Sequence, residues 1–187
     1  MPRQVPRRDF VKAAVSIGGT AALAACLKRE DAASLPTGTA DPSSLPRRQH
    51  AWADVLRTDD HGNDVQPEHH VLLLLEYQAD GPPSEGDRET LAAALDSLER
   101  AYQRGPDGLL STLGYSPAYF DRFDAALPDS VDLQEPRALA PFEEPELETP
   151  DAVLHLASDH GSVVLAAEEA LFGEQARLNG IEMAASI

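Results

Sequence analysis

Two kinds of hydrophobic pattern alternate along this chain after residue 67. Residues 69–77 form a short, nearly continuous apolar run, which predicts a β-strand buried on both faces. Residues 87–104 instead carry apolar side chains at helical spacing and predict an amphipathic helix, which Ser84 is placed to cap. The apolar stripe of this helix consists of Leu91, Ala94, Leu95, Leu98, Ala101 and Tyr102.

A second strand and a short helix follow. Residues 108–115 predict a strand with a sharp turn at Gly114, and Pro117 opens a predicted helix over residues 117–123. The stretch 124–150 is rich in proline and acidic residues, which favours a long, solvated loop that wraps around the domain.

The pattern then returns to a strand and a helix. Residues 151–157 predict a third strand, and residues 160–172 predict a helix capped by Ser158 or Asp159. Residues 181–187 begin a fourth strand. The order is therefore βαββαβ, and we expect an α+β, ferredoxin-like fold: an antiparallel sheet with helices on one face.

This expected architecture leaves one face of the sheet without helices. Residues 71–75 are apolar on both sides of the predicted strand. The second face therefore needs cover from another half-domain, another chain or the long loop.

The N-terminal residues predict a targeting signal rather than a part of the folded domain. Arg7 and Arg8, followed by Phe10, resemble the twin-arginine (Tat) export signal. Residues 13–25 are small and apolar, and this segment is too short to span a bilayer as a helix. We expect residues 1–25 to be a signal peptide.

Cys26 is the only cysteine of the chain, and it follows directly on this signal. Residues 23–26 resemble a lipobox, in which the signal is cut before the cysteine and the thiol is lipidated. The alternative is an ordinary cleavage site with an incidental cysteine. Residues 26–49 are then a flexible tether, and residues 50–187 the folded domain.

The composition of the chain limits the classes of partner and of metal site that can be expected. The chain has 187 residues and a formal net charge of −17, with Lys12 and Lys28 as its only lysines. An acidic surface depleted of lysine suits concentrated salt, although an acidic mesophilic protein is the alternative. Such a surface repels phosphates, so we expect no nucleic-acid partner. A lone cysteine excludes an intrachain disulfide and a cysteine-cluster metal site.

Four groups of polar residues are candidates for chemistry. Asp59–Asp64 looks like a cation loop but lacks EF-hand spacing, so we expect an exposed turn. His69 and His70 are adjacent in a strand and point to opposite faces, so they do not readily share one ion. His155 is expected to be a hydrogen-bonded core histidine, with a metal ligand as the alternative, and Tyr102 is expected to be packed rather than redox-active.

Two segments carry a resemblance to a known family. Residues 109–123 resemble the strand, the Gly-aromatic-small-Pro turn and the short helix in the first half of dye-decolourising (DyP-type) haem peroxidases. Residues 151–159 resemble the D-x-x-L-x-L-A-S-D strand of that family. The likeness covers roughly residues 50–175 and is greatest to Tat-exported, peroxidase-related proteins of salt-loving archaea.

The resemblance implies a scaffold without its chemistry. The family has two ferredoxin-like halves with haem in the second, and neither the Gly-x-x-Asp-Gly motif nor the haem-binding histidine and arginine has a match here. We therefore assign no catalytic, cofactor-binding or metal-ligating residue, and His155 and His160 are not promoted to those roles. Haem is expected only together with a second half.

Two hypotheses of function remain. The chain is either an incomplete haem peroxidase half or a non-catalytic surface lipoprotein that uses the same fold for binding or assembly. Both place it on the outer face of the cytoplasmic membrane, exported by Tat and anchored through lipidated Cys26. The expected partners are the membrane surface and either a second half-domain or a second copy of the chain.

Overall fold

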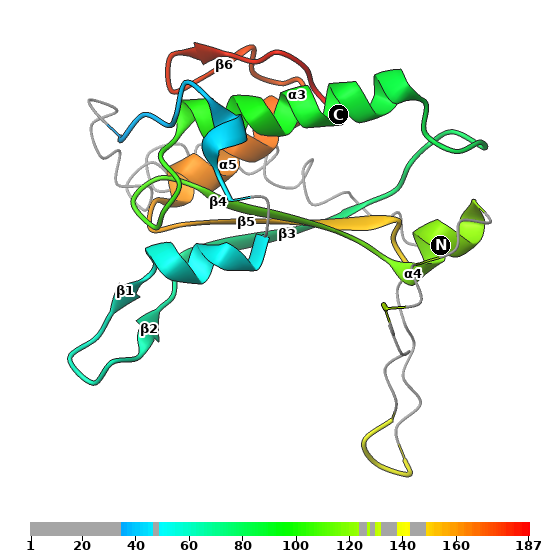
Figure 1. The fold of residues 1–187 in the computed structure, drawn as a ribbon, viewed down its shortest axis with the longest axis horizontal. Helices are drawn as coiled ribbons and strands as arrows, with labels where there is room; N and C mark the ends of the chain where they lie inside the picture. The colour runs from blue at the N-terminus through cyan, green and yellow to red at the C-terminus, as the bar shows by residue number, and fades with distance from the viewer. Residues whose placement is uncertain (1–34, 47–48, 124–126, 128–129, 132–137, 143–148) are drawn as a thin grey trace, which may run out of the picture. The chain divides into compact units, whose positions relative to one another are not determined.

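A three-stranded antiparallel sheet is the centre of the protein in the computed structural model, which describes residues 35–46, 49–123, 127, 130–131, 138–142 and 149–187. The central strand is β5 (Ala152–Ser158), which pairs with β3 (His69–Leu75) on one side and β4 (Leu110–Tyr115) on the other (Figure 1). Leu154 is aligned with Leu73 of β3 and with Leu113 of β4. The α+β class and the antiparallel sheet predicted from the sequence are confirmed.

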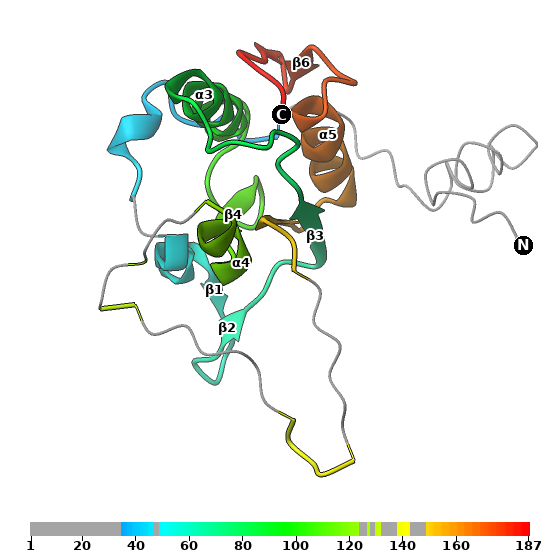
Figure 2. The ribbon, with the colours of Figure 1, turned by 90° about the vertical axis from the view of Figure 1, so that its right-hand side faces the viewer.

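Two helices cover one face of this sheet. α3 (Glu85–Ala101) connects β3 to β4, and α5 (Gly161–Leu171) follows β5 (Figure 2). α3 begins where Ser84 and Asp87 form the capping box: the Ser84 hydroxyl accepts from the Asp87 amide at 3.2 Å, and the Asp87 carboxylate accepts from the Ser84 amide at 2.8 Å. The cap predicted at Ser84 is confirmed.

The cap predicted for the other helix is wrong. The residue that precedes α5 is His160, whose side chain makes no capping hydrogen bond. The Ser158 hydroxyl accepts from the His160 amide, and the Asp159 carboxylate accepts from the Glu68 amide instead. The Ser158 hydroxyl also donates to the Gly108 carbonyl at 2.6 Å, so both side chains make tertiary contacts that the local sequence does not show.

The core lies between the sheet and the two helices. Leu154 and Leu156 of β5 are fully buried there. Most of the buried helix positions are small, which lets the helix backbones approach the sheet closely. The fully buried helix residues with small or branched side chains are Ala94, Ala101, Val163, Val164, Ala167 and Ala170.

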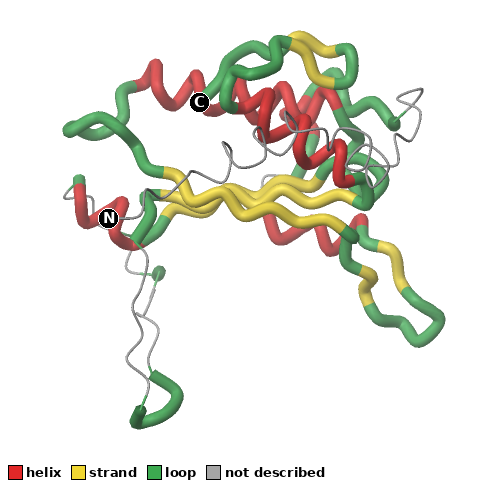
Figure 3. Tube along the Cα trace, turned by 180° about the vertical axis from the view of Figure 1, so that it is seen from behind, coloured by secondary structure: helices red, strands yellow, loops and turns green. Residues whose placement is uncertain are grey.

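Within the described ranges, a short helix covers part of the opposite face. η3 (Gln49–Val55), a 3-10 helix, lies on the side of the sheet away from α3 and α5 (Figure 3). A hairpin of β1 (Arg57–Thr58) and β2 (Asp64–Val65) follows it. The prediction that β3 is buried on both faces is wrong, because Leu72 and Leu74 are 65% and 54% exposed on this side.

The turn predicted at Gly114 is also wrong. Gly114 lies inside β4 and is aligned with Val153, so the strand continues to Tyr115. The chain turns at Ser116, whose hydroxyl accepts from the Tyr119 amide at 3.2 Å and donates to the Pro150 carbonyl at 2.5 Å. Ser116 thereby caps α4 (Pro117–Arg122), which Pro117 opens as expected.

The last predicted strand does not join the sheet. β7 (Ile181–Glu182) instead pairs with β6 (Arg177–Leu178) in a hairpin of its own, on the outer side of the helices (Figure 1). Asn179 and Gly180 have φ values of 47° and 81°, which a tight two-residue turn requires. Because the described residues contribute three strands to the sheet, the complete ferredoxin-like arrangement stays a prediction.

The compact unit begins earlier than expected. It extends over Pro36–Ile187, so its boundary lies within the stretch expected to be a tether. The Gly38 amide donates to the Arg100 carbonyl, and the Gln103 amide donates to the Pro36 carbonyl, at 3.1 and 2.8 Å. These backbone bonds hold residues 36–39 against the end of α3.

No helix in the described part of the chain is both long and apolar enough to cross a membrane. The predicted signal peptide, residues 1–25, with Arg7, Arg8, Phe10 and Cys26, lies outside the described residues.

Candidate functional site: the open face of the sheet

The open face is the side of the sheet that α3 and α5 do not cover. Strand alternation and the register place the even-numbered residues of β3 on it together with their partners on β5 and β4. Its residues are His70, Leu72, Leu74, Leu110, Thr112, Gly114, Val153, His155 and Ala157, of which Leu110 and Ala157 are buried. Leu72 and Leu74 give this face exposed apolar surface in the middle of an otherwise acidic chain.

The open face continues into a free strand edge. Among the described residues, β3 pairs only with β5, so its outer edge has unpaired backbone N–H and C=O groups. Glu68 and Glu76 are exposed at the two ends of this edge. In a βαββαβ sheet this is the edge at which a fourth strand would pair.

A pair of histidines occupies one end of the open face. His70 Nδ1 and His155 Nε2 lie 2.8 Å apart, and His70 Nε2 lies 2.8 Å from the Pro67 carbonyl oxygen. The Trp52 ring of η3 meets the His155 ring edge-on, at 5.2 Å between centroids. Trp52 therefore packs on the domain against His155, whereas His70 is exposed.

This geometry defines the protonation of the pair. The Pro67 carbonyl only accepts, so His70 Nε2 carries a hydrogen and donates it. In the neutral pair, His70 Nδ1 then accepts from His155 Nε2–H. Burial, and secondarily the nearby His70, lower the pKa of His155 below its ordinary value. His155 is hydrogen-bonded as expected, but it is half-buried on the open face and does not belong to the core.

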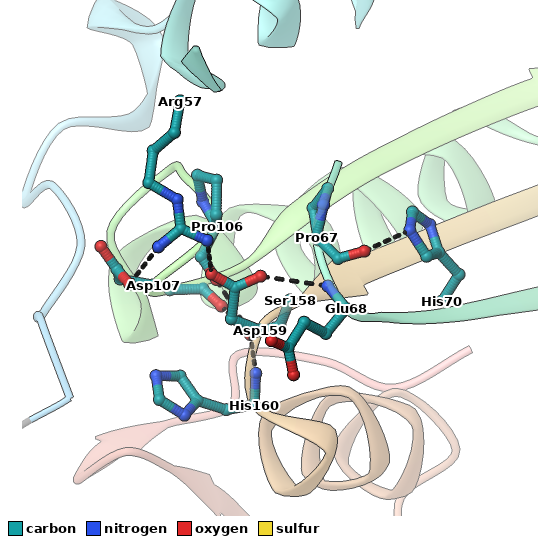
Figure 4. A network of polar contacts seen from close by, with 10 residues as sticks. Arg57, Pro67, Glu68, His70, Pro106, Asp107, Ser158, Asp159 and His160 are labelled. Atoms are coloured by element: carbon teal, nitrogen blue, oxygen red, sulfur yellow. Dashed lines mark hydrogen bonds and ion pairs between the residues drawn. The ribbon is translucent and has the colours of Figure 1, made fainter. Parts of the chain in front are cut away.

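Asp159 connects the hairpin, β3 and β5 at the same end of the sheet (Figure 4). Its carboxylate accepts from the Arg57 guanidinium and, at 3.0 Å, from the Glu68 amide, while its own amide donates to the Pro106 carbonyl at 2.8 Å. Arg57 also lies 3.7 Å from the Asp107 carboxylate. This network holds the start of β3 and the β1–β2 hairpin in place.

The other chemical candidates have structural roles. The His69 ring lies 3.4 Å from a Cβ position at Gly161 on the helix side, whereas His70 is on the open face, so the predicted opposite orientations are confirmed. Asp59 accepts from the amides of His61 and Asn63 in an exposed turn, as predicted. Tyr102 is buried, and burial raises the pKa of its hydroxyl.

The described residues do not fit a haem. His70 and His155 bond to each other and to a carbonyl, and two pockets of about 280 and 380 Å³ are lined by no histidine, a common haem ligand. No group of three or more His, Cys, Asp or Glu side chains able to hold a metal comes together in the described ranges. The arrangement on the open face is suited to binding through apolar area and a strand edge.

The sequence patterns singled out Asp159 only as a possible helix cap and did not single out Arg57. The two residues are 102 positions apart, and only the pairing of the strands brings them together. Another pair that the patterns did not reveal joins Glu99, in the last turn of α3, to Arg104, beyond its end: Glu99 Oε1 and Arg104 Nη1 lie 3.6 Å apart. A lone acid directly after a strand was the one local signal of Asp159.

Comparison with known proteins gives one family. No curated protein and no solved structure matches the chain. A family of unknown function, DUF7405, matches residues 67–187. The match begins two residues before β3 and extends through β7, so it includes the sheet and the helices that cover it. The chain belongs to this family of unknown function, DUF7405.

Proposed function

We propose that this protein is an exported, lipid-anchored assembly scaffold related to DyP-type peroxidases, and that its open face binds a second, haem-carrying half-domain. The observation that carries the proposal is the exposure of Leu72 and Leu74 beside the free edge of β3. Contiguous exposed apolar area of this kind marks interaction surfaces. The chain itself supplies a binding face rather than catalytic groups.

The apolar gain from covering this face is substantial. Full burial of a leucine side chain contributes about 1.5–3 kcal/mol, and roughly half of that remains to be gained at Leu72 and at Leu74. Val153 and Gly114 lie beside them and extend the surface across the sheet. A second sheet packed on this face would complete a two-layer interface.

Charge favours a different half-domain over a second copy. Each copy of the chain carries a formal net charge of −17. If the β3 edges of two copies paired antiparallel about Leu72, Glu68 of one copy would face Glu76 of the other. Like charges in that position are destabilising, although concentrated salt screens them. A partner with basic residues at these two positions avoids the repulsion.

A photo-crosslinking amino acid at position 72, in the native host, tests the proposal. The matched control places the same group at Leu165, which is 46% exposed on α5. We expect position 72, and not position 165, to crosslink a haem-binding polypeptide identified by mass spectrometry. Crosslinking only to a second copy supports instead the alternative, a non-catalytic surface lipoprotein that forms homodimers. Equal crosslinking at both positions, or none, contradicts both.

Haem chemistry has a separate test. The purified chain supplied with haem is expected to develop no Soret band and no peroxide-dependent dye oxidation, whereas the crosslinked assembly is expected to show both. Dye oxidation by the chain alone would overturn the scaffold role.

The export and anchoring part of the proposal depends on the N-terminal motifs. Changing Arg7 and Arg8 together to Lys is expected to block export, since these two residues resemble the arginine pair of the Tat signal. Cys26→Ser is expected to release the exported protein from the membrane fraction, because the acyl anchor is lost. If both variants still reach the membrane fraction, the proposed Tat export and lipid anchoring are wrong.

A further inference from the structure

A second candidate site lies on the helix-covered side of the sheet. A pocket of about 280 Å³ opens between α3, β4 and residues 42–46, including η2 (Pro42–Ser44). Its polar walls include Arg104, Glu99 and Ser111, and its apolar walls include Leu95 and Leu113. The open face contributes no residue to it.

Arg104 is the unusual member of this pocket. Its side chain is only 10% exposed, and its Nη1 atom lies 3.6 Å from Glu99 Oε1. The Nε and Nη2 atoms are buried and have no hydrogen-bond partner among the residues that the structure describes. These two atoms form one edge of the guanidinium, the edge whose parallel N–H groups bind the two oxygens of a carboxylate.

Nearby acids do not satisfy that edge. Glu99 is on the Nη1 side, and 3.6 Å is too long for a hydrogen bond. Asp96 is directed to Arg100, 3.8 Å away on the same helix. A buried cationic group with unmade hydrogen bonds is costly, and folded proteins retain such groups chiefly where a ligand or function requires them.

The pocket wall is built into the fold rather than loosely apposed. The amides of Gly38 and Thr39 donate to the carbonyls of Arg100 and Glu99 at 3.1 Å. A Cβ at Gly38 would come 1.9 Å from the Glu99 carbonyl oxygen, so only glycine allows this approach. Asp41 then caps η2, which forms one side of the pocket.

We propose that this pocket binds a small monocarboxylate, with its two oxygens on the Nε and Nη2 atoms of Arg104 and its short apolar tail between Leu95 and Leu113. The planar carboxylate matches the guanidinium edge, and the volume admits a ligand of a few carbon atoms. A doubly charged phosphate is disfavoured by Glu99 and Asp96.

Binding is coupled to Glu99. Burial raises the pKa of Glu99, while Arg104 and the Ser111 hydroxyl act in the opposite direction. A second carboxylate on Arg104 favours the protonated form of Glu99 further. Monocarboxylate affinity is therefore highest at mildly acidic pH and falls as pH rises. Asp96, Arg100 and Arg104 are the other charged groups of this region.

Butyrate is the probe, titrated by calorimetry into the whole chain carrying Cys26→Ser, with inorganic phosphate as the comparison. We expect butyrate to bind and to shift the Arg104 Nε–H resonance, with weaker binding at higher pH. Arg104→Gln should weaken binding on the order of tenfold or more. Arg104→Lys should also weaken it, because the charge is kept but the paired donors are lost. Glu99→Gln should retain binding and remove its pH dependence.

Arg100→Gln is the matched control, since Arg100 lies in the last turn of α3, four residues before Arg104, is more exposed and should leave affinity unchanged. Circular dichroism verifies that each variant is folded. If Arg104→Gln does not fold, Arg104→Lys is used in its place to test the paired donors. Three results would overturn the proposal: no butyrate binding by the chain with Arg104 intact, undiminished butyrate affinity in both Arg104 variants, or tighter binding of phosphate than of butyrate. The crosslinking test at position 72 is independent of these outcomes.

Discussion

The two faces of the sheet use the same kinds of residue and end in different environments. Leu154 and Leu156 of β5 are fully buried beneath α3 and α5, whereas Leu72 and Leu74 of β3 are more than half exposed on the other side. Both sets are apolar, and both belong to regular antiparallel strands. Burial is therefore decided by which elements cover a face and not by the hydrophobicity of the strand alone.

The difference separates stability from binding. Apolar residues on the covered face contribute to folding, because the unfolded chain exposes them and the folded one does not. Apolar residues on the open face still contact water, so their removal costs the isolated chain little. Four variants or conditions test this distinction, beginning with the largest expected effect.

Leu154→Ala is expected to lower the free energy of unfolding by about 2–5 kcal/mol, since it leaves a cavity in the core. The matched control is Val153→Ala, the next residue on the same strand, which is on the open face and should cost clearly less. Chemical denaturation in concentrated salt measures both. Equal losses for the two variants would show that the faces are not energetically distinct.

Trp52→Ala is expected to cost about 1–2 kcal/mol, since it removes the ring contact with His155 and the cover at this end of the open face. Hydrogen exchange of the η3 amides should accelerate in the same variant. Trp52→Phe, which retains an aromatic ring, should lose less. Unchanged exchange in Trp52→Ala would mean that η3 is held by other contacts.

Acidification is expected to lower the free energy of unfolding by a smaller amount that depends on pH. The pKa of His155 is lowered in the folded state from an ordinary value of 6.5, so the unfolded chain takes up a proton first as pH falls. Stability is therefore full above pH 6.5 and declines as pH falls from there through the folded-state pKa. Melting temperatures between neutral and mildly acidic pH measure this. His155→Gln should flatten the profile, and an unchanged slope in that variant would assign the effect elsewhere.

Leu74→Thr is expected to change stability least, within about 0.5 kcal/mol, because the side chain is exposed and threonine suits a strand. Leu73→Thr, its neighbour on the helix-covered side, serves as the comparison and should be clearly destabilising. A large loss for Leu74→Thr in a monomeric chain would show that something covers the open face.

Much of the local structure could be predicted from the sequence. Ser84 and Asp87 identify the start of α3 because a capping box involves residues only three positions apart. The three sheet strands follow from short apolar runs, and the opposite orientations of His69 and His70 follow from strand alternation. The turn predicted at Gly114 was wrong, since a glycine inside a strand looks locally like a turn.

The candidate sites were less predictable. The contact between His70 and His155 joins residues 85 positions apart, and the unpaired edge of Arg104 depends on where Glu99 and the wall around Gly38 lie. A sequence contains no signal for the absence of a hydrogen bond. The prediction of a fourth strand in the sheet was wrong for a related reason: Asn179 and Gly180 close a hairpin in which Ile181 pairs with Leu178 instead.

By itself, the sequence determined the α+β class, the order of the elements, the acidic composition and the cap that begins α3, since these depend on composition, periodicity and contacts between near neighbours. Only the tertiary structure decided which apolar face remains open, that β3 keeps a free edge, and that Arg104 is buried with one edge unpaired. Those properties depend on which segments cover which surface. Periodicity identifies an apolar face, but only long-range packing determines what covers it.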